Sequence, residues 1–266
     1  MSFKTRESSY SSHIDNSQPR YEYSSPTMTT HLTGVVVRLR IRHPVRWALG
    51  AAAAVVALGV AGPYVYIHFI EGPAPAVLTA GTSASGAVRP ATGSVAGSWQ
   101  VAQGSVAGYR VKEVLNGQSN TAVGRTTAVT GGFTATPTQV TTATITVDLT
   151  KVASDQTMRD GQFEGRIMQT SQYPTTKFTL TTPIDLTELA TAAGTRTVDV
   201  HGTLALHGKT KDVAVSLTVV RSGDTFTVSG QVPVVFADYG IDNPSFGFVQ
   251  TEDHGTIEVL LHLTKA

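Results

Sequence analysis

The feature that most constrains the fold is a regular alternation of polar and apolar residues in the second half of the chain. Residues 144–149 and 177–181 alternate without exception, residues 224–229 repeat the pattern, and residues 257–263 follow it except at Leu260. A longer stretch, residues 197–207, keeps its polar side chains at odd positions. A period of two is typical of β-strands with one buried face. We therefore expect an all-β domain over residues 98–266.

Tight turns divide this domain into hairpins. Gly208-Lys209 and Ser222-Gly223-Asp224 have the composition of short hairpin loops. The pattern predicts about eight antiparallel strands with long hairpins, and such a sheet must pair into a sandwich or close into a barrel.

One segment departs from the alternation. In residues 155–168, Met158, Phe163 and Ile167 lie at roughly helical spacing with charged residues between them, and Ser154 or Asp155 can cap a helix. We predict one short helix here, which packs Met158 and Phe163 against the strands as a plug or lid.

The N-terminal part of the chain has a different character. Residues 47–70 contain no Asp, Glu, Lys or Arg, and as a helix they are long enough to cross a hydrocarbon core of about 30 Å. Four arginines lie between residues 38 and 46, and Glu71 follows the segment. Since cytoplasmic flanks are enriched in Lys and Arg, we expect a single transmembrane anchor with its N-terminus in the cytoplasm and the C-terminal domain outside the cell membrane.

Two alternatives for this segment stay open. It can be a cleaved signal peptide, for which Ala74-Pro75-Ala76 resembles a cleavage site, or a buried core helix. The flanking segments are expected to lack a fold of their own. Residues 1–46 are expected to form a disordered basic tail in the cytoplasm; residues 1–34 lack apolar periodicity, and Met28 is an alternative start. Residues 71–97 are expected to form a flexible linker rich in Pro, Ala, Gly, Ser and Thr.

Composition excludes several functions. The chain has no cysteine, which excludes disulfides and thiolate metal sites, and its net charge of +1 argues against nucleic acid as a partner. No closely spaced histidine pair, nucleophile elbow or phosphate-binding loop is present. We therefore expect no catalytic residues, no metal site and no cofactor other than a possible bound lipid.

Several motifs in residues 98–266 resemble the YceI-like family of polyisoprenoid-binding proteins. They are Arg159-Asp160-Gly161-Gln162-Phe163 followed by Tyr173-Pro174, then His207-Gly208-Lys209-Thr210-Lys211, then Phe236-Ala237-Asp238-Tyr239-Gly240. The single anchor and the composition rich in Thr, Ala and Val are similar to the actinobacterial branch. Many relatives carry Asp-x-x-His-Ser near the start of the domain, whereas this chain has Ala102-Gln103-Gly104-Ser105. The resemblance implies a lipocalin-like antiparallel barrel whose apolar lumen holds a long isoprenoid chain.

The alternation itself indicates which side chains point inward. An eight-stranded barrel is just wide enough to be filled by side chains or to hold one slim ligand. The expected ligand-binding residues are Tyr109, Val111, Ile145, Val147, Phe178, Leu180, Val198, Val200, Leu204, Leu206, Val215, Leu217, Phe226, Val228, Ile257, Val259 and Leu261.

Two functions follow from these expectations. The first is a membrane-tethered, extracytoplasmic protein that binds an isoprenoid such as a quinone or polyprenyl carrier. The second is an interaction module at the cell envelope, built as a filled, non-catalytic β-sandwich without a lipid ligand.

Overall fold

A computed structural model describes residues 48–57, 73–81, 89–115, 117–247 and 249–266. The expected tail, and most of the expected anchor, lie outside these residues. Residues 48–57 are helical and expose Leu49, Val55 and Val56. Among the described residues, no helix combines the length and the apolar character that a membrane crossing requires.

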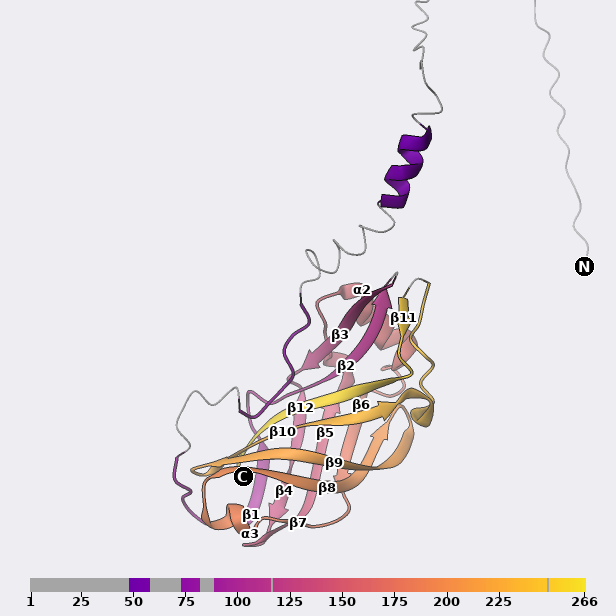
Figure 1. Cartoon of the computed structure of the whole chain (residues 1–266). Helices are drawn as coiled ribbons and strands as arrows, with labels where there is room; N and C mark the ends of the chain where they lie inside the picture. The colour runs from indigo at the N-terminus through magenta and orange to yellow at the C-terminus, as the bar shows by residue number, and fades with distance from the viewer. Residues whose placement is uncertain (1–47, 58–72, 82–88, 116, 248) are drawn as a thin grey trace, which may run out of the picture. The chain divides into compact units, whose positions relative to one another are not determined.

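Antiparallel strands make up most of the remainder (Figure 1). The strands are β1 (Gly97–Val101), β2 (Val106–Leu115), β3 (Gln118–Thr126), β4 (Val129–Ala135), β5 (Gln139–Asp148), β6 (Thr175–Leu180), β7 (Ile184–Asp185), β8 (Gly194–Leu206), β9 (Lys209–Ser222), β10 (Thr225–Val235), β11 (Val249–Thr251) and β12 (His254–Lys265). The helical segments are α2 (Thr157–Gln162) with the π-helical turn Phe163–Ile167, α3 (Thr187–Thr191), and 3₁₀ turns at Leu149–Lys151 and Phe236–Tyr239.

The sheet closes into a barrel, as the resemblance implies. Its strands follow the order β1-β4-β5-β6-β8-β9-β10-β12, and β12 returns to pair with β1. The filled sandwich is therefore wrong as an architecture. The short helix predicted over residues 155–168 is confirmed by α2 and the turn after it, whereas α3 has no signal in the alternation.

The first two strands, β1 and β2, pair one after the other with the same edge of β12. Along one edge of β12, residues 263–265 pair with β1 and residues 256–260 pair with β2. Between β1 and β2, the Ser105 hydroxyl donates to the Ala102 carbonyl and accepts from the His262 amide. As a strand, β3 pairs only with β2 among the described residues, and α2 lies beside these strands (Figure 1).

The two ends of the barrel consequently differ. We call the end that carries α2, β11 and the C-terminal ends of β2 and β10 the open end, and the end that carries α3 and β7 the closed end (Figure 1). The β8–β9 hairpin turns at the open end through His207 and Gly208, whose φ angles of 48° and 73° are both left-handed. The predicted turn is thus shifted by one residue, because Lys209 already pairs with Leu206.

Residues 73–81, which we call the strap, lie against the outside of the barrel. The Ala80 amide donates to Ser229 Oγ at 2.8 Å, and Ala80 and Leu78 pack on Leu260 and Val220. This differs from the flexible linker expected for residues 71–97. Backbone hydrogen bonds hold the segment, and a composition of Pro, Ala and Gly gives no periodic signal for them.

Candidate functional site

The barrel holds two adjacent apolar cavities. The mouth chamber, at the open end, has a volume of about 580 Å³, and the inner chamber, deeper in the barrel, has a volume of about 160 Å³. Val147, Thr176 and Ile257 line both, so the two chambers lie against each other, and together we call them the lumen. The mouth chamber reaches solvent, since Met158 and Phe246 line it and are 83% and 73% exposed.

The structure brings all of the sequence-predicted lumen residues to this site. Tyr109, Val111 and Leu206 line the mouth chamber, and Val147 and Ile257 lie where the chambers meet. The inner chamber is lined by Ile145, Phe178, Leu180, Val198, Val200, Leu204, Val215, Leu217, Phe226, Val228, Val259 and Leu261. The alternation therefore predicts the inward face of the strands that carry these side chains.

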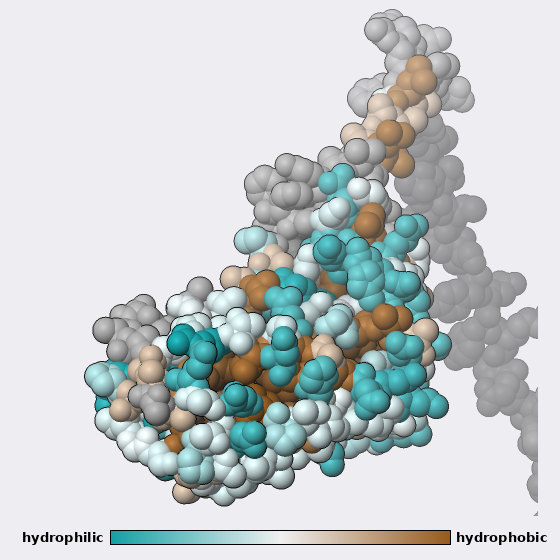
Figure 2. Space-filling view, turned by 60° about the horizontal axis from the view of Figure 1, so that its bottom comes forward, coloured by the Kyte–Doolittle hydropathy of each residue, from teal (hydrophilic) through white to brown (hydrophobic). Residues whose placement is uncertain are grey.

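The strands that line the inner chamber pair over only a short length between β6 and β8. Only Lys177–Leu180 pair with Gly202–Ala205, whereas β8 continues for eight further residues toward its start at Gly194. Nearby lumen side chains, including Phe178, Leu180 and Val198, are only half-buried. Figure 2 brings the underside of the barrel forward and shows a band of apolar side chains recessed between polar ones.

Two glycines keep aromatic rings flat against the wall. Gly124 pairs with Tyr109, and a Cβ at Gly124 would lie 2.3 Å from Cε1 of that ring. A Cβ at Gly202 would lie 2.4 Å from Cε2 of Phe178. Both rings therefore occupy space above a neighbouring strand that a side chain would otherwise fill.

The short helix contributes one wall of the mouth chamber. Phe163 is buried and stacks on Tyr109 with ring centroids 5.0 Å apart, as expected for a packed lid. Burial raises the pKa of the Tyr109 hydroxyl above its ordinary value, so this phenol stays neutral. The expectation for Met158 is wrong, because its side chain points into solvent at the rim.

Within the described part of the chain, the charged residues that line the lumen are Glu113, Arg159 and Arg166, all in the mouth chamber. Arg159 forms ion pairs with Asp155 and, at 3.5 Å, with Glu113. Arg166 donates to the Pro244 carbonyl at 2.8 Å and to Gln162 Oε1 at 3.1 Å. The chamber is thus apolar inside and polar at its edge, an arrangement that suits a ligand with an apolar tail and a polar head.

Sequence reasoning missed several lining residues. Some of them lie in strands, such as Leu115, Ala122 and Val234 in the mouth chamber. Others come from the helical segments and from the connections between strands, where a two-residue period does not exist. They include Leu149, Val152, Ile167, Met168, Phe236, Ile241 and Phe246. An apolar cluster around the motif Phe236-Ala237-Asp238-Tyr239-Gly240-Ile241 was the one available signal.

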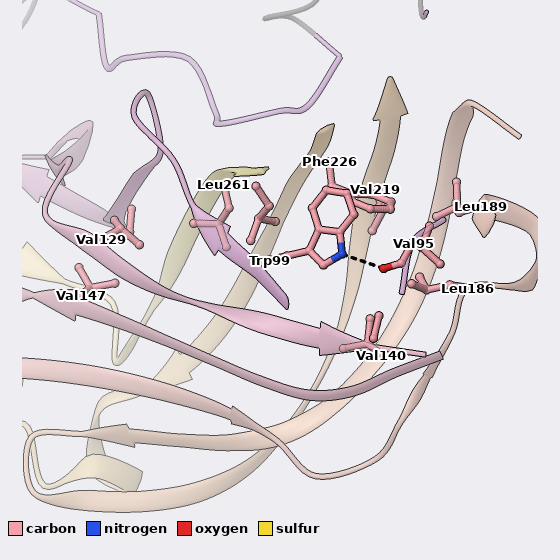
Figure 3. Close-up of a cluster of buried hydrophobic side chains, with 13 residues drawn as sticks. Val95, Trp99, Val129, Val140, Val147, Leu186, Leu189, Val219, Phe226 and Leu261 are labelled. Carbon is pink, nitrogen blue, oxygen red and sulfur yellow. Dashed lines mark hydrogen bonds between the residues drawn. The ribbon is translucent and has the colours of Figure 1, made fainter. Parts of the chain in front are cut away.

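The closed end is sealed by packed side chains (Figure 3). Trp99 lies edge-on to Phe226 with centroids 4.8 Å apart, and its Nε1 donates to the Val95 carbonyl at 2.8 Å. Arg221, which is 1% exposed, donates to the carbonyls of Leu189 and Gly93, among others. A ligand must therefore enter from elsewhere than this end.

The histidines do not form a metal site within the described part of the chain, where no group of three potential ligands is found. His207 is a buried residue of the β8–β9 turn, and its Nδ1 lies 3.2 Å from the Tyr239 carbonyl oxygen. His254 contacts Asp253 and Glu252 on an exposed turn.

Comparisons with known proteins find a family model and solved structures that this chain resembles. A family model described as "YceI-like domain" matches residues 99–263. A solved polyisoprenoid binding domain from Saccharophagus degradans, implicated in plant cell wall breakdown, is 20% identical, with a TM-score of 0.53 over 63% of this chain and 98% of that one. BcnA from Burkholderia cenocepacia is 21% identical, with a TM-score of 0.43 over 58% and 95% of the two chains. No curated protein matches the chain.

Proposed function

The chain belongs to the YceI-like family, and from this premise we propose that it is a membrane-tethered, extracytoplasmic lipid-binding protein. Its barrel holds the tail of a long isoprenoid, either a quinone or a polyprenyl carrier, and performs no catalysis. The head group of the lipid stays at the open end, next to the polar rim.

The observation that carries this proposal is the pair of adjacent apolar chambers in the barrel. A water molecule occupies about 30 Å³ in the liquid, so the two chambers together have room for about 25 atoms of similar size, or about five isoprene units. Each methylene transferred from water into such a lumen contributes about 0.8 kcal/mol. A tail of this length therefore gains enough free energy to leave water.

The tether is inferred from the sequence. The charge-free residues 47–70 and the preceding arginines favour a retained anchor with the barrel outside the cytoplasm. A barrel held there lies beside the bilayer in which isoprenoid lipids dissolve. The protein can thus take its ligand from that membrane and return it.

The polar groups near the lumen support binding rather than catalysis. Arg159 and Glu113 are engaged with each other at the rim, and the buried Tyr109 hydroxyl is held neutral by its raised pKa. These groups can orient a head group, but their arrangement offers no activated nucleophile.

Lipid extraction tests the proposal directly. The full chain is purified from membranes in a mild detergent, and organic extracts of the protein and of the starting membranes are compared by mass spectrometry. We expect isoprenoids to be enriched over phospholipids in the protein extract, at close to one molecule per chain. If both extracts have the same lipid composition, the protein carries only adventitious lipid and the proposal is wrong.

A further inference from the structure

The large apolar side chains that the barrel exposes gather at one end. Within residues 97–266, the described side chains of this kind are Val114, Met158, Val235 and Phe246. Val114 lies next to the last residue of β2, Met158 lies in α2, Val235 ends β10, and Phe246 lies in the connection to β11. All four belong to the open end, and Met158 and Phe246 also line the mouth chamber.

The strap reaches the barrel at this same end. Pro73 and Ala74 lie beside Lys112, Val114 and Ser119, near the turn between β2 and β3. The strap then descends along the wall, since Arg110 Nη2 donates to the Pro75 carbonyl at 2.6 Å and the Ala80 amide bonds Ser229 further down. The described part of the strap therefore begins, at Pro73, beside the open end.

A buried carboxylate holds the strap in place. Glu258 has an outward position in β12, between the lumen residues Ile257 and Val259, yet it is only 1% exposed because the strap covers it. Its carboxylate accepts from Arg110 Nε at 2.9 Å and from the Leu78 amide at 2.9 Å. Arg125 lies 3.4 Å from the same carboxylate and also donates to the Ala76 carbonyl. One ionic cluster thus joins three strands, β2, β3 and β12, to the strap.

This attachment limits how the barrel can sit on a membrane. The charge-free segment ends at Ile70, three residues before Pro73, and three extended residues span at most about 11 Å. By comparison, the twelve residues of β12 extend over about 40 Å. A bilayer that holds residues 47–70 consequently lies next to the open end and far from the closed end.

We propose that the open end is a docking surface for a phospholipid bilayer, into which Met158 and Phe246 insert. This inference rests on the tether in the proposed function. The mouth chamber then opens onto the acyl chains, so that an isoprenoid tail passes between bilayer and lumen without crossing water.

Site-directed labelling tests this docking, since the chain has no cysteine to interfere. Single variants Met158→Cys and Phe246→Cys of the full chain are labelled with an environment-sensitive fluorophore and reconstituted into phosphatidylcholine and phosphatidylglycerol vesicles. The vesicles contain lipids with a nitroxide high on the acyl chain, which quenches only inserted groups. Thr195→Cys, at an exposed position near the start of β8 at the closed end, is the matched control.

We expect quenching at positions 158 and 246 to be at least about threefold greater than at position 195. Flotation of the same samples in a density gradient measures whether the chain associates with vesicles, and so tests the tether separately from the docking surface. If the chain floats with vesicles but the three labels are quenched equally, the docking surface is wrong and the tether stands. If the chain does not associate with vesicles at all, both the tether and the docking surface are overturned.

Discussion

Replacing Val215 by phenylalanine tests whether a ligand tail reaches the inner chamber. Val215 lies on β9 opposite Val200 of β8, and both side chains line this chamber. Val215 itself is buried, so a larger apolar side chain at this position must occupy the lumen or displace its neighbours. The change keeps the chamber dry, and it adds no charge that would unfold the barrel.

The expected loss of affinity follows from the size of the chamber. At about 30 Å³ per atom, 160 Å³ holds about five carbon atoms, which is about one isoprene unit. Excluding five carbons from an apolar site costs about 4 kcal/mol, at about 0.8 kcal/mol each. This corresponds to a Kd increase of up to about 1,000-fold.

The effect should depend on the length of the tail. Binding is measured by calorimetric titration of detergent-solubilised full chain with quinones that carry one or eight isoprene units. The mouth chamber alone accommodates the short tail, so its affinity should not change in Val215→Phe, whereas the long tail should bind much more weakly. Ala214→Phe is the matched control, because Ala214 precedes Val215 in the same strand and is exposed on the outer face.

Stability must be followed in the same samples. Overpacking a core position costs about 1–3 kcal/mol, so strand content by circular dichroism should persist while the urea midpoint falls. Undiminished affinity for the long tail in a folded Val215→Phe would refute the reasoning, since it would mean that tails stop in the mouth chamber.

Three further predictions concern the lid, the lumen phenol and the topology. Phe163→Ala should lower the free energy of unfolding by about 3–5 kcal/mol in urea titrations because it removes a buried ring, whereas Met158→Ala should change it by less than about 0.5 kcal/mol because Met158 is exposed. Because the pKa of Tyr109 is raised in the folded state, the unfolded chain loses the phenol proton at a lower pH than the folded chain does, near the ordinary pKa of 10.0. Above that pH, the free energy of unfolding should fall by up to about 1.4 kcal/mol per pH unit. Tyr109→Phe should show a smaller fall between about pH 9 and pH 11, and equal falls would contradict the assignment. Protease added to intact spheroplasts should digest the barrel, and full protection would overturn its extracytoplasmic placement.

The lumen was predictable because strands impose a two-residue period on their side chains. Val215 and Ala214 are adjacent and both apolar, yet the alternation of β9 places one inside and one outside, as observed. The same reasoning fails at Phe246 and Phe236, which line the mouth chamber from irregular segments. No local pattern links such residues to the cavity, because only the closed barrel brings them there.

The strap shows a second limit of local patterns. The position of Glu258 in β12 predicts an outward and solvated carboxylate, and the outward direction is correct. Its burial arises from residues 180 positions earlier in the chain, where the Leu78 amide meets the carboxylate. Hydrogen bonds from a backbone carry no side-chain signature, so the sequence of the strap reads as a spacer.

The alternation of polar and apolar residues also does not predict whether an inward side chain fills the interior of the barrel or lies along its wall and leaves a cavity. In this chain the answer depends on small residues on the neighbouring strands. Tyr109 and Phe178 lie flat above Gly124 and Gly202, where any side chain would collide with the rings. With larger residues at the two glycines, both rings would have to turn toward the barrel axis and close the lumen. The space for a ligand tail is therefore set by pairs of residues on adjacent strands, a relation that exists only once the strand register is known.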